Sequence, residues 1–458
     1  MRALFLIIFA VVLLFGVFIV DAPTMLILLI AYFIGIALTR FLNRSNKNIV
    51  SIYSILFLVS SIYMIACYLY MSDKGFIYLF APDLYGTFYP MNEYYLQYGS
   101  YSQIVTHIWK DYQFLDRYFV GYYTYSTLWG VLAKSINANL YVTLQISTLF
   151  LYSFIGVVTY RLFLKSNFAK KAAFKYTLII SLCSIVFFYS SIFLRDIHIA
   201  LLYLIAIYLT FETKFSLTTL LKLMIVILIT CLFRIESGLF LFILIPVYLL
   251  ICLQKSKYKI TLISISAVLA IIIGFYYLSN RTSIDQIISD NREVYIESDK
   301  GSGITGTLER IPILGDFSLI LYNALQPIPF FNRLHPSPNS EYALPVDNIM
   351  RFPQSIAAVF NWIVIFYLLF WLFSNKMRKV TKGKIAKPLQ YNLWVGMVFF
   401  LLQSSVISQR RLIPFHIVYY ILFFIIYSCL KSDERKRLNA IAMFGFILLQ
   451  LVGVIYFT

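Results

Sequence analysis

Residues 49–71 have the sequence IVSIYSILFLVSSIYMIACYLYM, a stretch without a charged side chain. An α-helix needs about 20 apolar residues to cross the hydrocarbon core of a bilayer, and this stretch is long enough. Similar runs recur along the whole 458-residue chain, in which 61% of residues are hydrophobic and 13% are charged. The sequence therefore predicts an all-α polytopic membrane protein.

Basic residues concentrate in alternate connectors between the apolar runs. Cytoplasmic connectors of membrane proteins are rich in Lys and Arg, so we assign these connectors to the inner side. The inner side then holds 24 of the 38 Lys and Arg and 3 of the 20 Asp and Glu, and the outer side holds 14 bases and 17 acids. The net charge of +18 divides into +21 inside and −3 outside. It reflects orientation and does not indicate a nucleic-acid partner.

This assignment predicts one integral membrane domain, residues 1–458, with about 13 transmembrane helices and a cytoplasmic N-terminus. We expect the first span to be an uncleaved anchor rather than a signal peptide, because its apolar core is long and no A-x-A site precedes Asp21. The expected spans are 3–20, 24–42, 49–71, 140–160, 174–194, 197–211, 217–233, 237–253, 260–278, 355–373, 389–407, 412–430 and 438–457.

A long outer segment at about 72–139 separates the third span from the fourth. Residues 118–136 are apolar enough to cross, but a crossing there would place the basic run 161–171 outside, so we expect an amphipathic or re-entrant surface helix. Asp83, early in this segment, is a candidate general base, and a solvated loop carboxylate is the alternative. The aromatic residues that follow suit stacking on sugar rings, and an interfacial aromatic belt is the alternative.

A second outer segment, at about 279–353, contains 9 acids, 6 bases and seven prolines. The prolines predict an irregular path, and such length without regular structure is typical of a functional lid or binding loop. Its candidate substrate-binding residues are Arg292, Arg333 and His335. Residues 301–306 match G-x-G-x-x-G, but no strand precedes them, so we interpret them as a hinge.

The five cysteines lie in or at the ends of apolar spans, and the four histidines are scattered. The cysteine pattern excludes a disulfide framework as the organising feature. The histidine pattern does not favour a metal site built by protein ligands alone. We expect no cofactor, and a divalent cation shared with substrate phosphates stays open.

Three short outer turns each place arginine between two apolar runs. They are 193–198, with Arg195, Asp196 and His198; 233–238, with Arg234 and Glu236; and 408–414, with Arg410 and Arg411. Charged groups at this depth usually face a polar cavity or a partner, and arginine binds phosphate oxygens in bidentate fashion. An interhelical ion pair or a snorkelling side chain would explain any single turn. Three turns at one depth favour a phosphate-binding site, with Asp83, Asp196 and Glu236 as candidate catalytic or orienting carboxylates.

Arginines beside a carboxylate and an aromatic surface suit the transfer of a sugar from a polyprenyl phosphate or pyrophosphate. The arginines would stabilise charge on the leaving phosphate, and the carboxylate would deprotonate the acceptor hydroxyl. Because the leaving group is a lipid phosphate, this chemistry requires no nucleotide-binding motif.

This layout resembles the GT-C superfamily of lipid-linked-sugar glycosyltransferases, and the motifs SSIFLRD at 190–196, FRIE at 233–236 and RRLIP at 410–414 look like those of bacterial Wzy-type repeat-unit polymerases of O-antigen and capsule. The resemblance implies polymerisation of lipid-linked oligosaccharides at the outer face of the bacterial cytoplasmic membrane, with undecaprenyl pyrophosphate as the leaving group. It implies that Asp83 occupies the base position. It also implies that Arg195, Arg234, Arg410 and Arg411 bind phosphate and glycan.

The expected partners are the lipid bilayer, the undecaprenyl-linked oligosaccharide, a chain-length regulator and a flippase, with no nucleic acid. Two alternatives stay open. A GT-C enzyme that adds one sugar from a polyprenyl phosphate would use the same residues. A flippase or transporter of lipid-linked glycans would instead need charges along a path through the membrane, together with inverted repeats.

Overall fold

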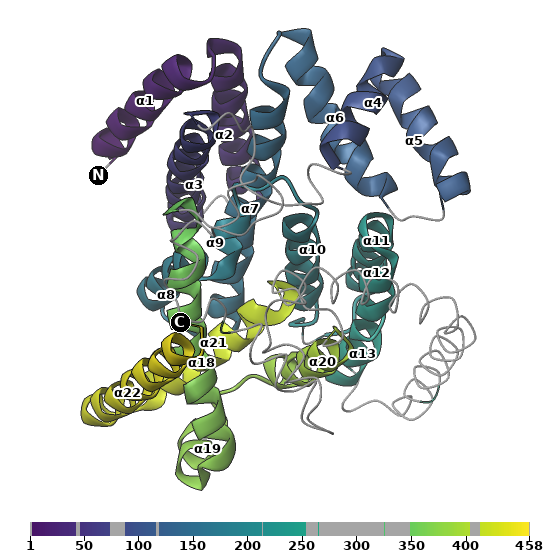
Figure 1. Ribbon diagram of the computed structural model, residues 1–458. Helices are drawn as coiled ribbons and strands as arrows, with labels where there is room; N and C mark the ends of the chain where they lie inside the picture. Colours follow the sequence, from purple (N-terminus) through teal and green to yellow (C-terminus); the bar gives the residue numbers. More distant parts are fainter. Residues whose placement is uncertain are drawn as a thin grey trace.

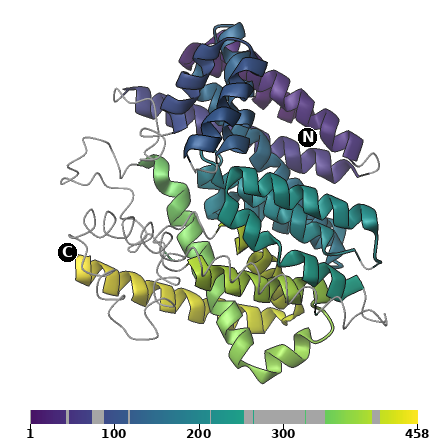
Figure 2. The ribbon, with the colours of Figure 1, turned by 90° about the vertical axis from the view of Figure 1, so that its right-hand side faces the viewer.

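The computed structural model describes residues 2–42, 46–73, 88–115, 119–212, 214–252, 349–403 and 413–457, together with Ser264 and Leu325. Every regular element in these ranges is a helix (Figures 1 and 2), which confirms the all-α class. Apart from the two single residues, the expected span 260–278 and most of the second outer segment lie outside this part of the chain.

The first half of the bundle is arranged around α7, Leu140–Lys165. On one side it packs against α2, Ala22–Leu42, and α3, Lys47–Asp73, with α1, Arg2–Ile19, outside them (Figure 1). On the other side it packs against α10, Asp196–Leu209. Large side chains such as Tyr152 and Phe163 are completely buried on α7, so this helix forms the centre of the apolar core.

Within the described ranges, four helices are long and apolar enough to cross a membrane, judged by length and composition: Ala22–Phe41, Lys47–Asp73, Leu140–Lys165 and Phe352–Phe373. Shorter apolar helices occupy Phe5–Ile19, Asp196–Leu209, Leu217–Phe233, Ser237–Cys252 and Phe415–Cys429. These helices agree with an all-α membrane protein, whereas the total of about 13 spans stays a prediction.

Two expected spans are interrupted. In place of one helix over 174–194, α8 (Lys170–Cys183) and α9 (Ile185–Tyr189) meet at Ser184, whose backbone is extended at φ −98° and ψ 164°. In place of one helix over 237–253, α12 (Ile235–Leu241) precedes α13 (Leu244–Cys252). Pro246 lies in the first turn of α13, where its missing N–H is tolerated, and so it favours a new helix start.

The remaining helices complete the second half of the bundle. The element α11, Leu217–Phe233, has the expected bounds of its span. The C-terminal elements are η4 Ile349–Arg351, α18 Phe352–Phe373, α19 Asn375–Thr381, α20 Lys387–Gln403, α21 Ile413–Cys429 and α22 Ser432–Phe457. The short helix α19 lies in a connector where the sequence predicted none.

At one end of the bundle, hydrogen bonds gather around Asn139, which caps α7. Its backbone N–H donates to the Asp21 carboxylate at 3.2 Å and lies 2.8 Å from the Thr24 hydroxyl. Its side-chain amide donates to the hydroxyl of Tyr68 at 3.3 Å. The α1–α2 turn, the last part of α3 and the start of α7 therefore meet here, and we call this the Asn139 end.

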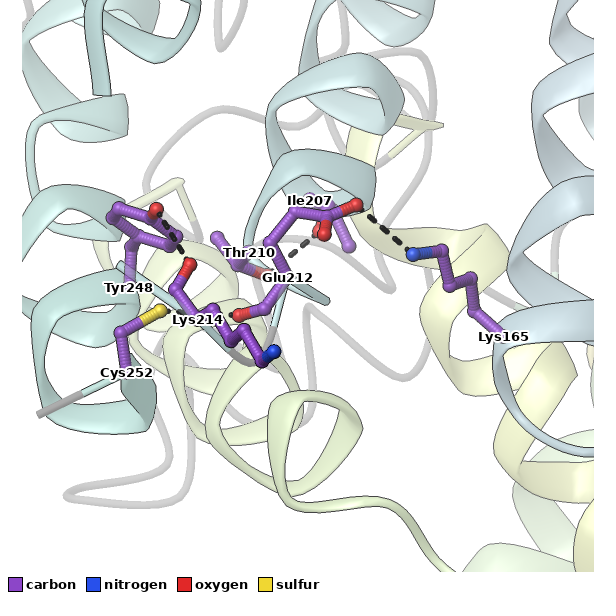
Figure 3. A network of polar contacts seen from close by, with 7 residues as sticks. All are labelled: Lys165, Ile207, Thr210, Glu212, Lys214, Tyr248 and Cys252. Carbon is purple, nitrogen blue, oxygen red and sulfur yellow. Dashed lines mark hydrogen bonds and ion pairs between the residues drawn. The ribbon is translucent and has the colours of Figure 1, made fainter. Parts of the chain in front are cut away.

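At the opposite end, Lys165 at the close of α7 forms a 2.9 Å ion pair with Glu212, just after α10 (Figure 3). The thiol of Cys252, at the end of α13, donates to the Glu212 carbonyl, and the Tyr248 hydroxyl bonds to the Lys214 carbonyl. Phe424, near the end of α21, packs against the ring of Phe163. These contacts define the Lys165 end.

These contacts sort helix ends into the same two groups that the charge pattern predicted as outer and inner. Lys165 is itself one of the counted bases, whereas the contacts around Asn139 involve no Lys or Arg, so the agreement supports the predicted order of the helices. The assignment of each end to a side of the membrane stays a prediction.

The predicted first outer segment, where the structure describes it at 88–115 and 119–138, folds into helices near the Asn139 end. They are α4 Tyr89–Tyr95, η2 Leu96–Tyr98, α5 Tyr101–Leu115 and α6 Val120–Ser135. They lie at the top of the molecule in Figure 1. Phe119, before α6, contacts Arg195 at the start of α10, and Asn139 follows α6 closely. The surface or re-entrant position of α6 in the membrane stays a prediction.

Candidate functional site

The centre of the candidate site is the non-helical turn 190–195 between α9 and α10, whose residues 190–194 are completely buried. Buried irregular backbone needs partners for its polar groups. The Gln145 side-chain amide donates to the Ser191 carbonyl at 2.6 Å, and the Tyr122 hydroxyl donates to the Phe193 carbonyl at 3.3 Å. Helices α6 and α7 thus hold this turn in a fixed conformation.

Arg195 is the last residue of the turn and precedes the first residue of α10. Its guanidinium carbon lies 4.3 Å from the ring centre of Phe119 and 6.0 Å from that of Phe88. A guanidinium over an aromatic face is stabilised by about 0.5–2 kcal/mol, depending on how far it is desolvated. The two rings therefore fix the half-buried Arg195 side chain between the bundle and the helices of the first outer segment.

Asp196 and Arg234 form a buried ion pair, with 3.3 Å between a carboxylate oxygen and Nη2. The side chains are 3% and 10% exposed. Asp196 lies in the first turn of α10, where the helix dipole favours a negative charge. Arg234 lies between α11 and α12 with an extended backbone. Two of the three predicted arginine turns therefore come together through a carboxylate of one and a guanidinium of the other.

His198 lies on the first turn of α10 among the rings of Tyr122, Tyr125 and Phe233, with centroid distances of 5.0–5.3 Å. It is 2% exposed, and neither ring nitrogen makes a hydrogen bond of ordinary geometry to the described residues. In this structure a phosphate group could not reach His198. Its predicted substrate-binding role would therefore require the aromatic cage to open.

The other predicted site residues are not placed. Glu236 lies within α12, and its side chain is outside the described residues. The candidates Asp83, Arg292, Arg333, His335, Arg410 and Arg411 are also outside them. The structure therefore tests the proximity of two arginine turns and leaves the third turn and the proposed base as predictions.

Several residues at the site were not singled out by the sequence. Gln145 and Tyr122 hold the turn, and Arg351, before α18, lies over the Phe188 ring at 5.7 Å. Gln145 had a visible signal, because a glutamine inside an apolar span must find a polar partner. Arg351 was recognised only as one base of the second outer segment. Its position against α9 depends on packing that sequence patterns do not contain.

The elements α4, η2 and α5, which follow Phe88 in the chain, carry a group of aromatic side chains. Tyr98 stacks on His107 with 3.7 Å between ring centres, and its hydroxyl bonds to that of the exposed Tyr94. Burial, followed by the nearby Asp111 carboxylate, raises the pKa of Tyr95 well above its usual range. The Tyr95 hydroxyl therefore stays protonated at neutral pH and is a hydrogen-bond donor.

No group of three or more His, Cys, Asp or Glu that could hold a metal ion occurs in the described ranges. The chain matches no family model, no curated protein and no solved structure. Function must therefore be argued from the site itself.

Proposed function

We propose that this chain is a membrane glycosyltransferase that polymerises lipid-linked oligosaccharide repeat units, with undecaprenyl pyrophosphate as the leaving group. The observation that carries the proposal is the buried turn 190–195, which holds Arg195 beside the aromatic helices of the first outer segment. A fixed arginine at an apolar boundary stabilises developing phosphate charge without reorganising during the reaction.

The buried pair of Asp196 and Arg234 supports the site by orienting its backbone. Arg234 and Asp196 bind each other, so we assign both a positioning role. We assign phosphate contact to Arg195 because its half-buried guanidinium lies against the rings of Phe119 and Phe88. Arg410 and Arg411 would supply further contacts to the pyrophosphate. This division refines the sequence-based expectation that Asp196 acts in catalysis.

Asp83 is the proposed general base. It precedes Phe88 by five residues, and an extended chain of that length covers at most about 18 Å. Phe88 in turn contacts Arg195. The chain therefore allows Asp83 and Arg195 to contact the same substrate molecule. In the proposed reaction, Asp83 takes the proton of the acceptor hydroxyl, the new glycosidic bond forms, and the pyrophosphate leaves with the bonding electron pair.

The orientation is part of the proposal. The Asn139 end would face the outside of the bacterial cytoplasmic membrane, and the Lys165 end would face the cytoplasm. The lipid tail of the donor would lie among the apolar helices, with its headgroup next to the turn. A chain-length regulator and a flippase are the expected partners.

The test is the length distribution of surface glycan in a gene deletion complemented with wild type, Arg195→Ala or Asp83→Asn at matched expression. Arg437→Ala, an exposed arginine at the Lys165 end, is the control. We expect both site variants to lose long chains while single repeat units are still delivered. For Asp83→Asn the polymerisation rate should fall by about 100-fold or more. Long chains that lack one sugar would instead identify a single-sugar GT-C enzyme.

A glycan flippase is the second candidate, and the interrupted helices favour it. Breaks at Ser184 and between α12 and α13 resemble the discontinuous helices at transporter binding sites. If the deletion strain accumulates lipid-linked units on the inner leaflet, the polymerase proposal fails and the transporter is supported.

A further inference from the structure

The connector between α18 and α20 has an unusual charge composition. Residues 375–387 contain six bases and no acid. The bases Arg378, Lys379, Lys382 and Lys384 are exposed. This density exceeds what orientation requires, since a few bases in a short connector already set the sidedness of neighbouring spans.

The short helix α19 is fixed against the bundle rather than free in solvent. Met377 and Thr381 are buried on one face, and the Trp371 indole N–H donates to the Thr381 hydroxyl at 2.8 Å. The Ser374 hydroxyl accepts the Met377 N–H and caps the helix. The bases therefore occupy defined positions on a rigid support, at the end of the molecule away from α4 and α5 (Figures 1 and 2).

One base of this connector is already neutralised. Lys376 forms a 2.6 Å ion pair with Glu434 in the first turn of α22. The same carboxylate accepts the backbone N–H of Lys431 at 3.2 Å. This pair joins α19 to α22, and it leaves the net positive charge of the connector on Arg378 and the lysines after it.

Large apolar side chains are exposed directly beside these bases. Phe373 is 78% exposed at the end of α18, and Leu372 and Val380 are each more than 40% exposed. Bases next to exposed apolar side chains are typical of a segment at the boundary between headgroups and acyl chains. A soluble anion would satisfy the bases alone, whereas a lipid would satisfy both groups.

We propose that residues 372–387 form a binding site for an anionic phospholipid. Arg378, Lys379 and Lys382 contact the phosphate headgroup, and Phe373 and Val380 contact the acyl chains. The site requires only that the Lys165 end meets a bilayer surface, so it does not depend on the proposed polymerase activity.

The test titrates dioleoyl phosphatidylglycerol or dioleoyl phosphatidylcholine into the delipidated full-length protein in detergent and counts bound lipids by native mass spectrometry. Wild type should bind phosphatidylglycerol in preference to phosphatidylcholine. The triple variant Arg378→Gln, Lys379→Gln, Lys382→Gln should bind it about 100-fold more weakly at low ionic strength, because each base near an anionic surface contributes about fivefold.

The matched control is Lys170→Gln, Lys171→Gln, Lys175→Gln, which removes three exposed bases from the start of α8. This control should keep the affinity of wild type. Phe373→Ser should weaken binding without a change in charge, and inorganic phosphate should not displace the lipid. Equal loss in the two triple variants, equal binding of both lipids, or displacement by phosphate would each overturn the proposal.

Discussion

At the scale of single residues, the ion pair between Asp196 and Arg234 is costly because both charges leave water to form it. The pair joins the start of α10 to the turn between α11 and α12, and each partner fixes the backbone next to it. An apolar pair of similar volume should pack in the same space. Replacing both charges therefore separates the role of the pair in specifying this arrangement from its role in stability.

The first prediction concerns this pair. Arg234→Met alone should lower the free energy of unfolding by about 3–5 kcal/mol, because it leaves a buried carboxylate without its arginine. Asp196→Leu with Arg234→Met should recover most of that loss. Thermal stability in detergent, followed by fluorescence-detected size-exclusion chromatography, measures both, with Arg437→Met as the exposed control. A double variant no more stable than the single one would show that the pair is required for folding.

The second prediction concerns pH. Glu434 precedes the predicted last span, and its hydrogen bond from Lys376, followed by that from the Lys431 backbone, lowers the pKa of this carboxyl group. The ionised Glu434 carboxylate therefore stabilises the folded protein above the pKa of the unfolded chain, about 4.3. This stabilisation is lost as pH falls through the lower pKa of the folded protein.

The melting temperature of wild type should therefore exceed that of Glu434→Gln at pH 7. The difference should close below about pH 4, within the range of shifted carboxyl groups. The comparison of two proteins at each pH cancels the titration of all other acids. A difference that persists unchanged to pH 3 would contradict the assignment.

At the scale of elements, close approach between α11 and α12 sets the direction of Arg234. A Cβ atom on Gly238 would lie 2.5 Å from the backbone nitrogen of Cys231 and 2.7 Å from its Cα atom. Because backbone cannot rotate out of the way as a side chain can, only glycine allows this reversal of the chain.

The third prediction follows from that contact. Gly238→Ala should lower the free energy of unfolding by about 1–3 kcal/mol through a shift of the α12 backbone. Gly130→Ala is the control, since the three atoms nearest to its Cβ atom would be side-chain atoms of Leu96, which can move. Melting temperatures of both variants in detergent measure the effect. Equal losses of stability would show that the backbone contact of Gly238 with Cys231 is not the cause.

The elements also show what the sequence could predict. Helices α2, α3 and α11 match the expected spans closely, because an uninterrupted apolar run has one favourable structure in a bilayer. The break at Ser184 was not predicted, because the run there stays apolar and contains no proline or glycine. The sequence predicted that the turns with Asp196 and Arg234 lie at the same depth. It could not predict their direct ion pair, because that pair depends on how the two turns pack.

At the scale of the whole molecule, the helix ends form two groups whose contacts agree with alternate crossing of a membrane. The proposed site and the aromatic helices lie at the Asn139 end. The basic connectors lie at the Lys165 end. The chain thus separates its proposed chemistry from its proposed lipid site by the length of the bundle.

The fourth prediction tests this separation. In a background with the five native cysteines replaced by serine, Ser100→Cys should react with a membrane-impermeant maleimide in intact spheroplasts. Lys171→Cys should react only after permeabilisation. Both positions are exposed, so burial does not explain a difference. Labelling of both variants in intact spheroplasts would show that the two ends do not lie on opposite sides.

The buried turn 190–195 also has a consequence for biosynthesis. Its two carbonyl partners, Gln145 and Tyr122, precede it in the chain, so they are already synthesised when the turn leaves the ribosome. Arg234 follows Asp196 by 38 residues. At a synthesis rate of roughly 5–20 residues per second, the carboxylate is made about 2–8 s before its arginine. We therefore expect α10 to enter the bilayer only together with α11, as a hairpin released by the translocon in one step.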